Sequence, residues 1–370
     1  MELMEDGTTI EQQMFAMAAE KKVPLYGVLE LLPLCNLNCD MCYVRMSREE
    51  MEEVGRLRTM EEWTKTAEDM MKAGTLFVLL TGGEPLLYPH FRELYQKLRE
   101  LGMIITINTN GTLIDEAWAD FFAENKPRRI NITLYGADDQ AYGKLCHYPA
   151  GFQKTVNAIR MLRDREIDVK INGSITLKNE EDIKKILDIA KQYDAAVNLD
   201  TYMYPASRER NKPFDEQSRM NPKDAAMAKV LIYKYQMGDI AFEEYRRAII
   251  NTIEQYIPEN YGYERHISCL AGNCSFTINW QGMIRPCVMQ SMPQVNVFDK
   301  GFLQGWETIS NETKKILINE ACVSCRYRPI CNTCAAAALL ETGNYDGIPE
   351  YICEYTKEFY RIMKEGARIC

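Results

Sequence analysis

The chain has 370 residues, and its 44 Lys and Arg against 53 Asp and Glu give a net charge of −9. This acidity, with no basic tract to offset it, argues against nucleic-acid binding. No apolar run approaches the roughly 20 residues of a membrane span, and the acidic N-terminus lacks the basic region of a signal peptide. Thirteen cysteines without a secretion signal therefore indicate a reducing, cytoplasmic location and metal binding rather than disulfides.

Short β-rich runs alternate with amphipathic helical segments from Val28 to about Asp200. This alternation predicts right-handed βαβ units with a parallel sheet, in an α/β fold. Six such units are fewer than an eight-stranded barrel needs, so an open sheet and a partial barrel both remain possible. The strand candidates are residues 28–34, 76–80, 104–108, 130–134, 168–175 and 196–202.

The stretch from Pro205 to Pro222 is polar and turn-rich, and we interpret it as a linker or mobile loop. Helical segments are expected after it, and a loop-rich region with most of the cysteines starts near His266. The expected helices are 225–237, 242–256, 334–341 and 354–364. The chain thus divides into an N-terminal segment (1–25), an α/β domain (26–215), a helical linker (216–265) and a cysteine-rich domain (266–370).

Three cysteines follow the first strand candidate in the spacing C-x3-C-x2-C: Cys35, Cys39 and Cys42. Three thiolates can hold three corners of a [4Fe–4S] cluster, which normally takes four cysteine ligands. The remaining iron could then bind a small molecule and react with it. A zinc knuckle or buried apolar thiols are the alternatives, but zinc would need a fourth Cys or His nearby, and the nearest His is His90.

The segment Gly82-Gly83-Glu84-Pro85 directly follows the second strand candidate. Adjacent glycines let a backbone approach a ligand closely, and exposed backbone groups can bind a charged amine. The segment lies one βα unit after the cysteine loop, at the carboxyl end of a strand, where parallel α/β folds bind ligands. An ordinary turn is the alternative.

Together the two motifs resemble the radical S-adenosylmethionine (SAM) superfamily, in which SAM fills the open site on the iron. The resemblance implies a partial (β/α)6 TIM-like barrel, with Cys35, Cys39 and Cys42 as cluster ligands. It further implies reductive cleavage of SAM to a 5′-deoxyadenosyl radical. The SAM-binding positions implied in the same way are Met41, Tyr43, Gly82, Gly83, Glu84, Asn110, Thr133 and Ser174. For Asn110 and Thr133 an ordinary strand-end turn remains an alternative.

Eight further cysteines between Cys269 and Cys353 make two complete four-thiolate sites. From spacing alone, zinc and iron–sulfur clusters are both possible. The pattern resembles the SPASM domain, the auxiliary-cluster extension of radical SAM enzymes, although the last pair has two intervening residues where that family has three, which puts the role of Cys334 in doubt. By resemblance, one [4Fe–4S] cluster takes Cys269, Cys274, Cys287 and Cys334, and the other takes Cys322, Cys325, Cys331 and Cys353. Of the remaining two, Cys146 is expected to be a buried structural thiol and Cys370 a free one at the terminus.

SPASM enzymes mostly modify peptides, so the resemblance implies a peptide maturase that crosslinks a ribosomally made precursor oxidatively, through a thioether or C–C bond. The alternatives are anaerobic sulfatase maturation (formylglycine formation), peptide epimerisation and a non-enzymatic iron–sulfur electron carrier. Val288 stands where sulfatase-maturating relatives carry an Asp, which argues against sulfatase maturation.

No catalytic residue is assigned. Asp200 and Tyr202 are candidate bases at the end of the sixth strand candidate, but a solvated strand end explains them equally well. The expected partners are a precursor peptide and a reductant such as flavodoxin or ferredoxin. Because only about 25 residues precede the first strand candidate, too few for an independent domain, a separate leader-binding protein is also possible.

Overall fold

The computed structural model describes residues 9–204, 218–258, 261–267 and 269–366. Its main feature is one mixed sheet of nine strands in the order β6-β5-β4-β3-β2-β1-β7-β8-β9, which does not close. Each of the first six strands runs parallel to its neighbours. These strands are β1 (Tyr26–Glu30), β2 (Phe77–Thr81), β3 (Ile104–Thr109), β4 (Arg129–Thr133), β5 (Val169–Ser174) and β6 (Ala196–Asp200). The predicted α/β fold with a partial barrel is therefore confirmed.

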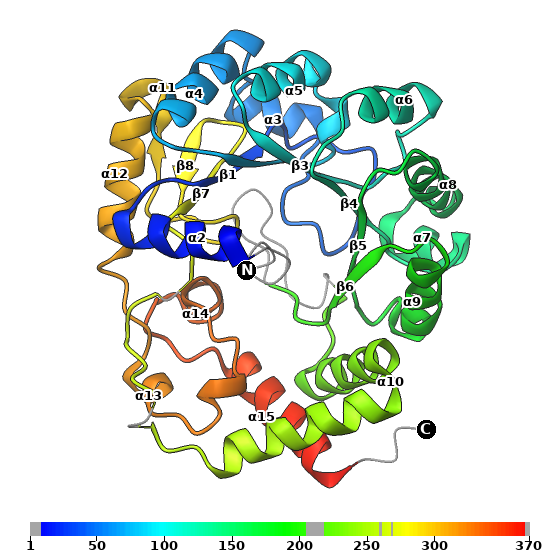
Figure 1. Cartoon of the computed structure of the whole chain (residues 1–370), viewed down its shortest axis with the longest axis vertical. Coiled ribbons are helices and arrows are strands. Elements are labelled where there is room, and N and C mark those ends of the chain that lie inside the picture. Colours follow the sequence, from blue (N-terminus) through cyan, green and yellow to red (C-terminus); the bar gives the residue numbers. More distant parts are fainter. Residues whose placement is uncertain (1–8, 205–217, 259–260, 268, 367–370) are drawn as a thin grey trace.

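In Figure 1 the strands form an arc, with helices along its outer side. Apolar side chains on the strands are buried beneath these helices; Ile130, Ile132 and Ile171, for example, are fully inaccessible. These three side chains lie on the same face of the sheet, because Ile130 and Ile132 are two residues apart and Ile171 pairs with Ile132. The helices that belong to the barrel are α3 (Arg48–Val54), α4 (Met60–Lys72), α5 (Phe91–Glu100), α6 (Glu116–Glu124), α7 (Asp139–Cys146), α8 (Gly151–Asp164) and α9 (Ile183–Gln192).

Three strands from the cysteine-rich segment extend the sheet beyond β1: β7 (Ser275–Ile278), β8 (Met283–Arg285) and β9 (Val295–Asn296). β7 pairs in parallel with β1, with Tyr26 opposite Ser275. A Cβ on Gly27 would come within 2.6 Å of the Phe276 ring, so this glycine lets the ring lie against β1. The sequence reading did not predict these strands, because they are short and their partner lies some 250 residues earlier in the chain.

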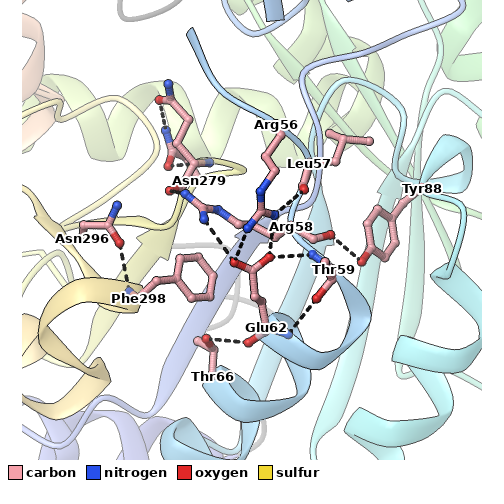
Figure 2. A network of polar contacts seen from close by, with 11 residues as sticks. Arg56, Leu57, Arg58, Thr59, Glu62, Thr66, Tyr88, Asn279, Asn296 and Phe298 are labelled. Atoms are coloured by element: carbon pink, nitrogen blue, oxygen red, sulfur yellow. Dashed lines mark hydrogen bonds and ion pairs between the residues drawn. The ribbon is translucent and has the colours of Figure 1, made fainter. Parts of the chain in front are cut away.

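A polar network fixes the β7–β8 turn to the start of α4 (Figure 2). Arg58 donates one hydrogen bond to the carbonyl of Gln281 at 2.6 Å and another to Glu62 at 3.2 Å. Its guanidinium also lies 4.4 Å from the centre of the Phe298 ring. Arg56 binds the same Glu62 carboxylate through two nitrogens, at 2.7 and 2.9 Å. Residues far apart in sequence thus meet at the end of the sheet.

The remaining helices are α2 (Thr9–Lys21), α10 (Pro222–Glu254), α11 (Val297–Lys300), α12 (Phe302–Thr313), α13 (Glu320–Val323), α14 (Ala335–Thr342) and α15 (Glu350–Glu365). The two helical segments expected in the linker form α10, with a break at Gly238, whose φ is 74°. The α2 helix, which was not predicted, places Phe15 against Phe77, with ring centres 5.4 Å apart. In Figure 1, α13, α14 and α15 lie together with α10 at the end of the molecule away from β3.

Most of the polar, turn-rich stretch from Pro205 to Pro222 lies outside the described residues, since residues 205–217 are not described. Cys370 is not described either. Among the helices that the structure describes, none combines the length and the apolar character needed to cross a membrane. The four expected domains stay a prediction, and β7 to β9 tie the last of them to the barrel sheet.

Candidate functional site

The cysteine loop after β1 lies directly against the loop after β2. The backbone N–H of Gly83 donates to the carbonyl of Leu32 at 2.7 Å, and that of Glu84 donates to Leu34 at 2.9 Å. A Cβ on Gly82 would lie 2.5 Å from the Leu32 oxygen, and one on Gly83 would lie 2.2 Å from the Leu34 oxygen. The two glycines are therefore required for close approach of one backbone to another, an explanation that the sequence alone did not provide.

Glu84 is completely buried. Its carboxylate accepts hydrogen bonds from the Thr109 hydroxyl at 2.8 Å and from the backbone N–H groups of Asn110 at 2.9 Å and Leu86 at 3.1 Å. Burial raises the pKa of Glu84 to about 7, while these hydrogen bonds act in the opposite direction. The structure thus places Glu84 as a brace between the loops after β2 and β3.

Asn110 lies at the end of β3, and its side chain points to the cysteine loop. Its amide nitrogen is 2.9 Å from the Asn36 side-chain oxygen and 3.7 Å from the Cys35 sulfur. Asn36 in turn donates to the Thr112 hydroxyl at 2.7 Å. Sequence reasoning missed Asn36, although an Asn directly after the first cysteine was a signal that could have been followed.

The sulfur atoms of the loop are surrounded by hydrogen-bond donors. The backbone N–H of Leu37 lies 3.4 Å from the Cys35 sulfur, and that of Arg45 lies 3.2 Å from the Cys42 sulfur. Donors aimed at sulfur stabilise thiolates, which are the form that binds metal.

The three thiols of the loop are also electrostatic neighbours. Burial, and after it the charge on Glu84, raise the pKa of Cys35 to about 12. The Cys42 and Cys39 thiolates act in the same direction. A positively charged cluster would reverse this unfavourable accumulation of negative charge. The residues present therefore fit a cluster bound by three cysteines.

The other expected SAM-binding positions surround this loop. Met41 is buried and Tyr43 is half-buried, on either side of Cys42. Thr133 ends β4 and Ser174 ends β5, so both lie at the carboxyl edge of the sheet, as predicted. Sequence reasoning did not select Tyr135, which lies two residues after Thr133. Burial is the main cause that raises the pKa of Tyr135, and the neighbouring thiolates of the cysteine loop also raise it.

The eight later cysteines fall into two neighbourhoods. Burial is the main cause that raises the pKa of Cys287 to about 12, and the thiolates of Cys334 and Cys269 contribute to this shift. Burial also raises the pKa of Cys274 to about 12. The charge on Lys22 acts to lower this pKa, and the neighbouring Cys269 thiolate acts to raise it. The first neighbourhood therefore contains Cys269, Cys274, Cys287 and Cys334.

Cys353 belongs to the second neighbourhood. Burial is the main cause that raises its pKa to about 11, and the thiolates of Cys331, Cys322 and Cys325 contribute to this shift. Cys331 and Cys334 thus belong to different neighbourhoods although only two residues separate them.

Among the described residues, no three His, Cys, Asp or Glu side chains lie close enough to hold a single metal ion.

A cavity of about 480 Å³ separates the end of β6 from these cysteines. Four cysteines line it: Cys269, Cys287 and Cys334 from the first neighbourhood, and Cys331 from the second. On the barrel side it is bounded by Asp200, Tyr202, Tyr204 and Lys229. Its volume lies in the range of small-molecule and cofactor pockets.

The structure argues against Tyr202 as a base. Its hydroxyl donates to Glu341 at 2.8 Å, and Arg219 binds the same carboxylate at 2.9 Å. Burial and the Glu341 charge both raise the pKa of Tyr202, which keeps the phenol protonated. Asp200 is exposed at the rim of the cavity, where its carboxylate accepts a hydrogen bond from the backbone N–H of Tyr202. Burial, and after it the neighbouring Cys334 thiolate, raise the pKa of Tyr204, a residue that sequence reasoning also missed.

Residues 29–191 match the Radical SAM superfamily. The chain contains a radical SAM domain. The expectation of a radical SAM enzyme is therefore confirmed, and this domain implies a [4Fe–4S] cluster and SAM. The matched region includes the cysteine loop and the Gly-Gly-Glu segment, the two parts that the structure brings into contact.

The chain is 25% identical over 344 residues to the AdoMet-dependent heme synthase of Methanosarcina barkeri, covering 89% of this chain and 96% of that protein. It is 26% identical over 295 residues to the antilisterial bacteriocin subtilosin biosynthesis protein AlbA of Bacillus subtilis, covering 79% of this chain but only 60% of AlbA. A solved structure of anSMEcpe with bound AdoMet and the Cp18Cys peptide has the same fold, with a TM-score of 0.70 and 20% identity over 93% of this chain and 97% of that one.

Proposed function

We propose that this chain uses SAM and a [4Fe–4S] cluster on Cys35, Cys39 and Cys42 to modify a peptide, by oxidative crosslinking of a ribosomally made precursor. The observation that carries the proposal is the packing of the Gly82-Gly83 backbone on the cysteine loop. It sets the strand-end groups that would bind the SAM amine beside the three thiols.

Each residue of this site has a distinct task. The three cysteines would hold the cluster, and the N–H groups of Leu37 and Arg45 would stabilise charge on its sulfurs. Glu84 fixes the turn that carries Asn110. When bound, the cluster and SAM together supply reductive cleavage of SAM and hydrogen abstraction from the substrate. A flavodoxin or ferredoxin in the cytoplasm would be the reductant.

Reductive SAM cleavage tests this part of the proposal. Anaerobically reconstituted protein with dithionite and SAM should release methionine and 5′-deoxyadenosine, whereas a Cys35/Cys39/Cys42→Ala variant should not. Cys370→Ala is the control and should retain the activity of the unmodified protein. SAM binding without any cleavage would contradict the proposal and favour the electron carrier.

The two neighbourhoods of later cysteines would hold two further [4Fe–4S] clusters. Crosslinking removes two hydrogen atoms from a peptide, one by abstraction and the second as a proton and an electron. That electron needs an acceptor close to the substrate, and the cavity between β6 and the cysteines is bounded by both neighbourhoods. By this ligand count the protein should contain about 12 irons, falling to about eight in the triple variant. Zinc in place of iron, or only four irons, would contradict the assignment.

The names of the relatives support a peptide substrate. AlbA acts in the biosynthesis of a bacteriocin, and anSMEcpe was solved with a bound peptide. A short peptide encoded beside this gene would be the substrate to test, with or without a separate leader-binding protein. Its product should be lighter by two hydrogens per crosslink, with one 5′-deoxyadenosine formed each time. Unchanged mass with one solvent deuterium at a Cα would indicate epimerisation, and formylglycine would indicate sulfatase maturation.

An iron porphyrin is the second candidate substrate, because the heme synthase of M. barkeri matches over almost its whole length. Incubation with iron coproporphyrin III, SAM and dithionite distinguishes the two candidates. A SAM-dependent mass change of the porphyrin would favour this second function, whereas an unchanged porphyrin together with a modified peptide would support the first.

A further inference from the structure

A second cavity, of about 350 Å³, lies beside the turn between β7 and β8. Its walls come from the segment that joins α3 to α4 and from β8 and β9. Six polar side chains line it, three arginines and three amides: Arg56, Arg58, Arg285, Gln281, Gln294 and Asn296. Among the described residues that line it, none is acidic. Guanidinium and amide groups supply many N–H donors, so the cavity suits a ligand that accepts hydrogen bonds.

Two of these arginines share one carboxylate. Figure 2 shows both guanidinium groups turned toward Glu62, which Arg56 binds at 2.7 and 2.9 Å and Arg58 at 3.2 Å. Two positive charges on one negative charge leave a positive charge in excess, before Arg285 is counted. A guanidinium group has five N–H donors, and the bonds to Glu62 occupy only some of them. The cavity is therefore positively charged in a chain whose net charge is −9.

One guanidinium donor is buried without a partner. In the part of the chain that the structure describes, the Arg58 Nε has no hydrogen-bond partner, and the Arg58 side chain is only 18% exposed. Contact with the Phe298 ring, whose centre lies 4.4 Å away, fixes the guanidinium group in this position. Buried donors nearly always have a partner, so this one indicates that the cavity takes a ligand. Arg285 is buried too, with 5% of its surface exposed.

We propose that this cavity is an anion-binding site in which Arg58 and Arg285 bind a carboxylate or phosphate group. The planar fork of an arginine matches two oxygens of such a group, and hydrogen bonds between ionised partners are roughly twice as strong as neutral ones. Arg56, whose side chain is 61% exposed, would meet the anion at the entrance. The Asn296 side-chain oxygen accepts the N–H of Phe298 at 2.9 Å, so its NH₂ group remains a donor. This inference does not rest on the proposed function.

Two sources supply this chemistry. Because β7 runs parallel to β1, the turn after β7 lies at the same edge of the sheet as the cysteine loop. An acidic side chain of a peptide bound at this edge is therefore one source, and a free anion is the other.

The test is isothermal titration calorimetry of the reconstituted full-length protein, at low ionic strength and without SAM. The probes are inorganic phosphate and the peptide acetyl-Ala-Glu-Ala-amide, with acetyl-Ala-Gln-Ala-amide as its neutral counterpart. We expect saturable binding at one site per chain, weakened by added potassium chloride because salt screens the charges. Binding of the Glu peptide but not the Gln peptide would support a peptide carboxylate, and binding of phosphate alone would support a free anion.

Variants locate the site. Arg58→Gln and Arg285→Gln should each weaken binding about tenfold, the loss expected for a hydrogen bond to a charged group. Glu62→Gln should instead strengthen binding, because it removes the competing negative charge and keeps all three arginines. The control is Arg247→Gln, on α10, whose side chain is 69% exposed and pairs with Glu243; it should bind as the unmodified protein does.

Three outcomes would overturn the inference. The first is that neither phosphate nor the Glu peptide binds saturably to the unmodified protein. The second is unchanged affinity in Arg58→Gln, and the third is weaker binding in Glu62→Gln. Circular dichroism checks that each variant folds, and if Arg285→Gln does not, Arg58→Gln and Glu62→Gln decide the question. Since the measurement uses no SAM, its result is independent of SAM cleavage, and the two proposals can fail separately.

Discussion

The cysteine loop of the barrel and the later cysteines are held in different ways. The loop is fixed by backbone hydrogen bonds to the segments after β2 and β4 and lies on a large continuous core. The later cysteines lie on short elements, such as the four residues of α13 and the 3-10 turn at Arg328–Ile330. Ile316, Ile318 and Ala335 form a small local core there, and the alanines that follow in α14 are also buried. We therefore expect the barrel to hold its loop without metal, and the second region to become rigid when its cysteines bind metal.

Removal of iron tests this difference and should give the largest effect. After anaerobic chelation, amide hydrogens in residues 317–353 should lose most of their protection, because the elements that carry its cysteines are short. Amides of β2 to β4 should exchange as slowly as before. Hydrogen exchange followed by mass spectrometry measures both regions in one sample. Equal loss of protection in the two regions would show that the comparison is wrong.

Glu341→Ala should weaken the junction of the two regions. This residue of α14 faces Arg219 and Tyr202, and the side chains of Glu341 and Arg219 are only 8% and 6% exposed. Removing one partner of a buried ion pair costs about 3–5 kcal/mol, because the other charge keeps its desolvation cost. Denaturant unfolding of the reconstituted protein measures the loss of stability.

The matched control is Glu254→Ala, which breaks the exposed pair with Lys364. Exposed ion pairs contribute about 0–1 kcal/mol, so this variant should remain close to the unmodified protein. A similar loss of stability in both variants would contradict a special role for the buried pair.

Gly83→Ala tests how rigidly the barrel loop is held. Its Cβ would lie 2.2 Å from the Leu34 oxygen, so the cysteine loop would have to shift. We expect a loss of about 1–3 kcal/mol, as for other overpacked sites, together with weaker SAM binding measured by calorimetry. In Gly102→Ala nothing lies within 4 Å of the new Cβ, and only the φ of 78° is strained. This control should cost about 1 kcal/mol and leave SAM binding unchanged.

The smallest effect is expected at Glu62. The hydrogen bonds from Arg56 are the main cause that lowers the pKa of Glu62 to about 2, from an ordinary value of 4.5. A lowered folded-state pKa stabilises the fold above pH 4.5, and this contribution disappears as the pH falls toward 2. Glu62→Gln should therefore lose up to about 1 kcal/mol at pH 7, and less at pH 3.5. A difference that grows on acidification would contradict this assignment.

Sequence patterns over short distances predicted much of this protein. The alternation of strands and helices predicted the parallel sheet, and five of the six strand candidates match observed strands to within two residues at each end. The first candidate extended to residue 34, but β1 ends at Glu30, because the apolar residues after it are buried in the cysteine loop rather than in the sheet. The spacing of Cys35, Cys39 and Cys42 was sufficient to identify the loop.

The tertiary structure decided what depends on residues far apart in the chain. Spacing could not show that Cys331 and Cys334 would face different neighbours, nor that the carbonyl of Cys146 would accept the N–H of Asn38 beside Cys39. It also gave no sign that β7 would join β1. Periodicity reports which face of an element is buried, but not what covers that face. The partner is chosen by close packing and hydrogen bonding in the assembled fold, which is why the sequence could not show that Glu84 braces the turn at Asn110. Its predicted contact with SAM stays a prediction.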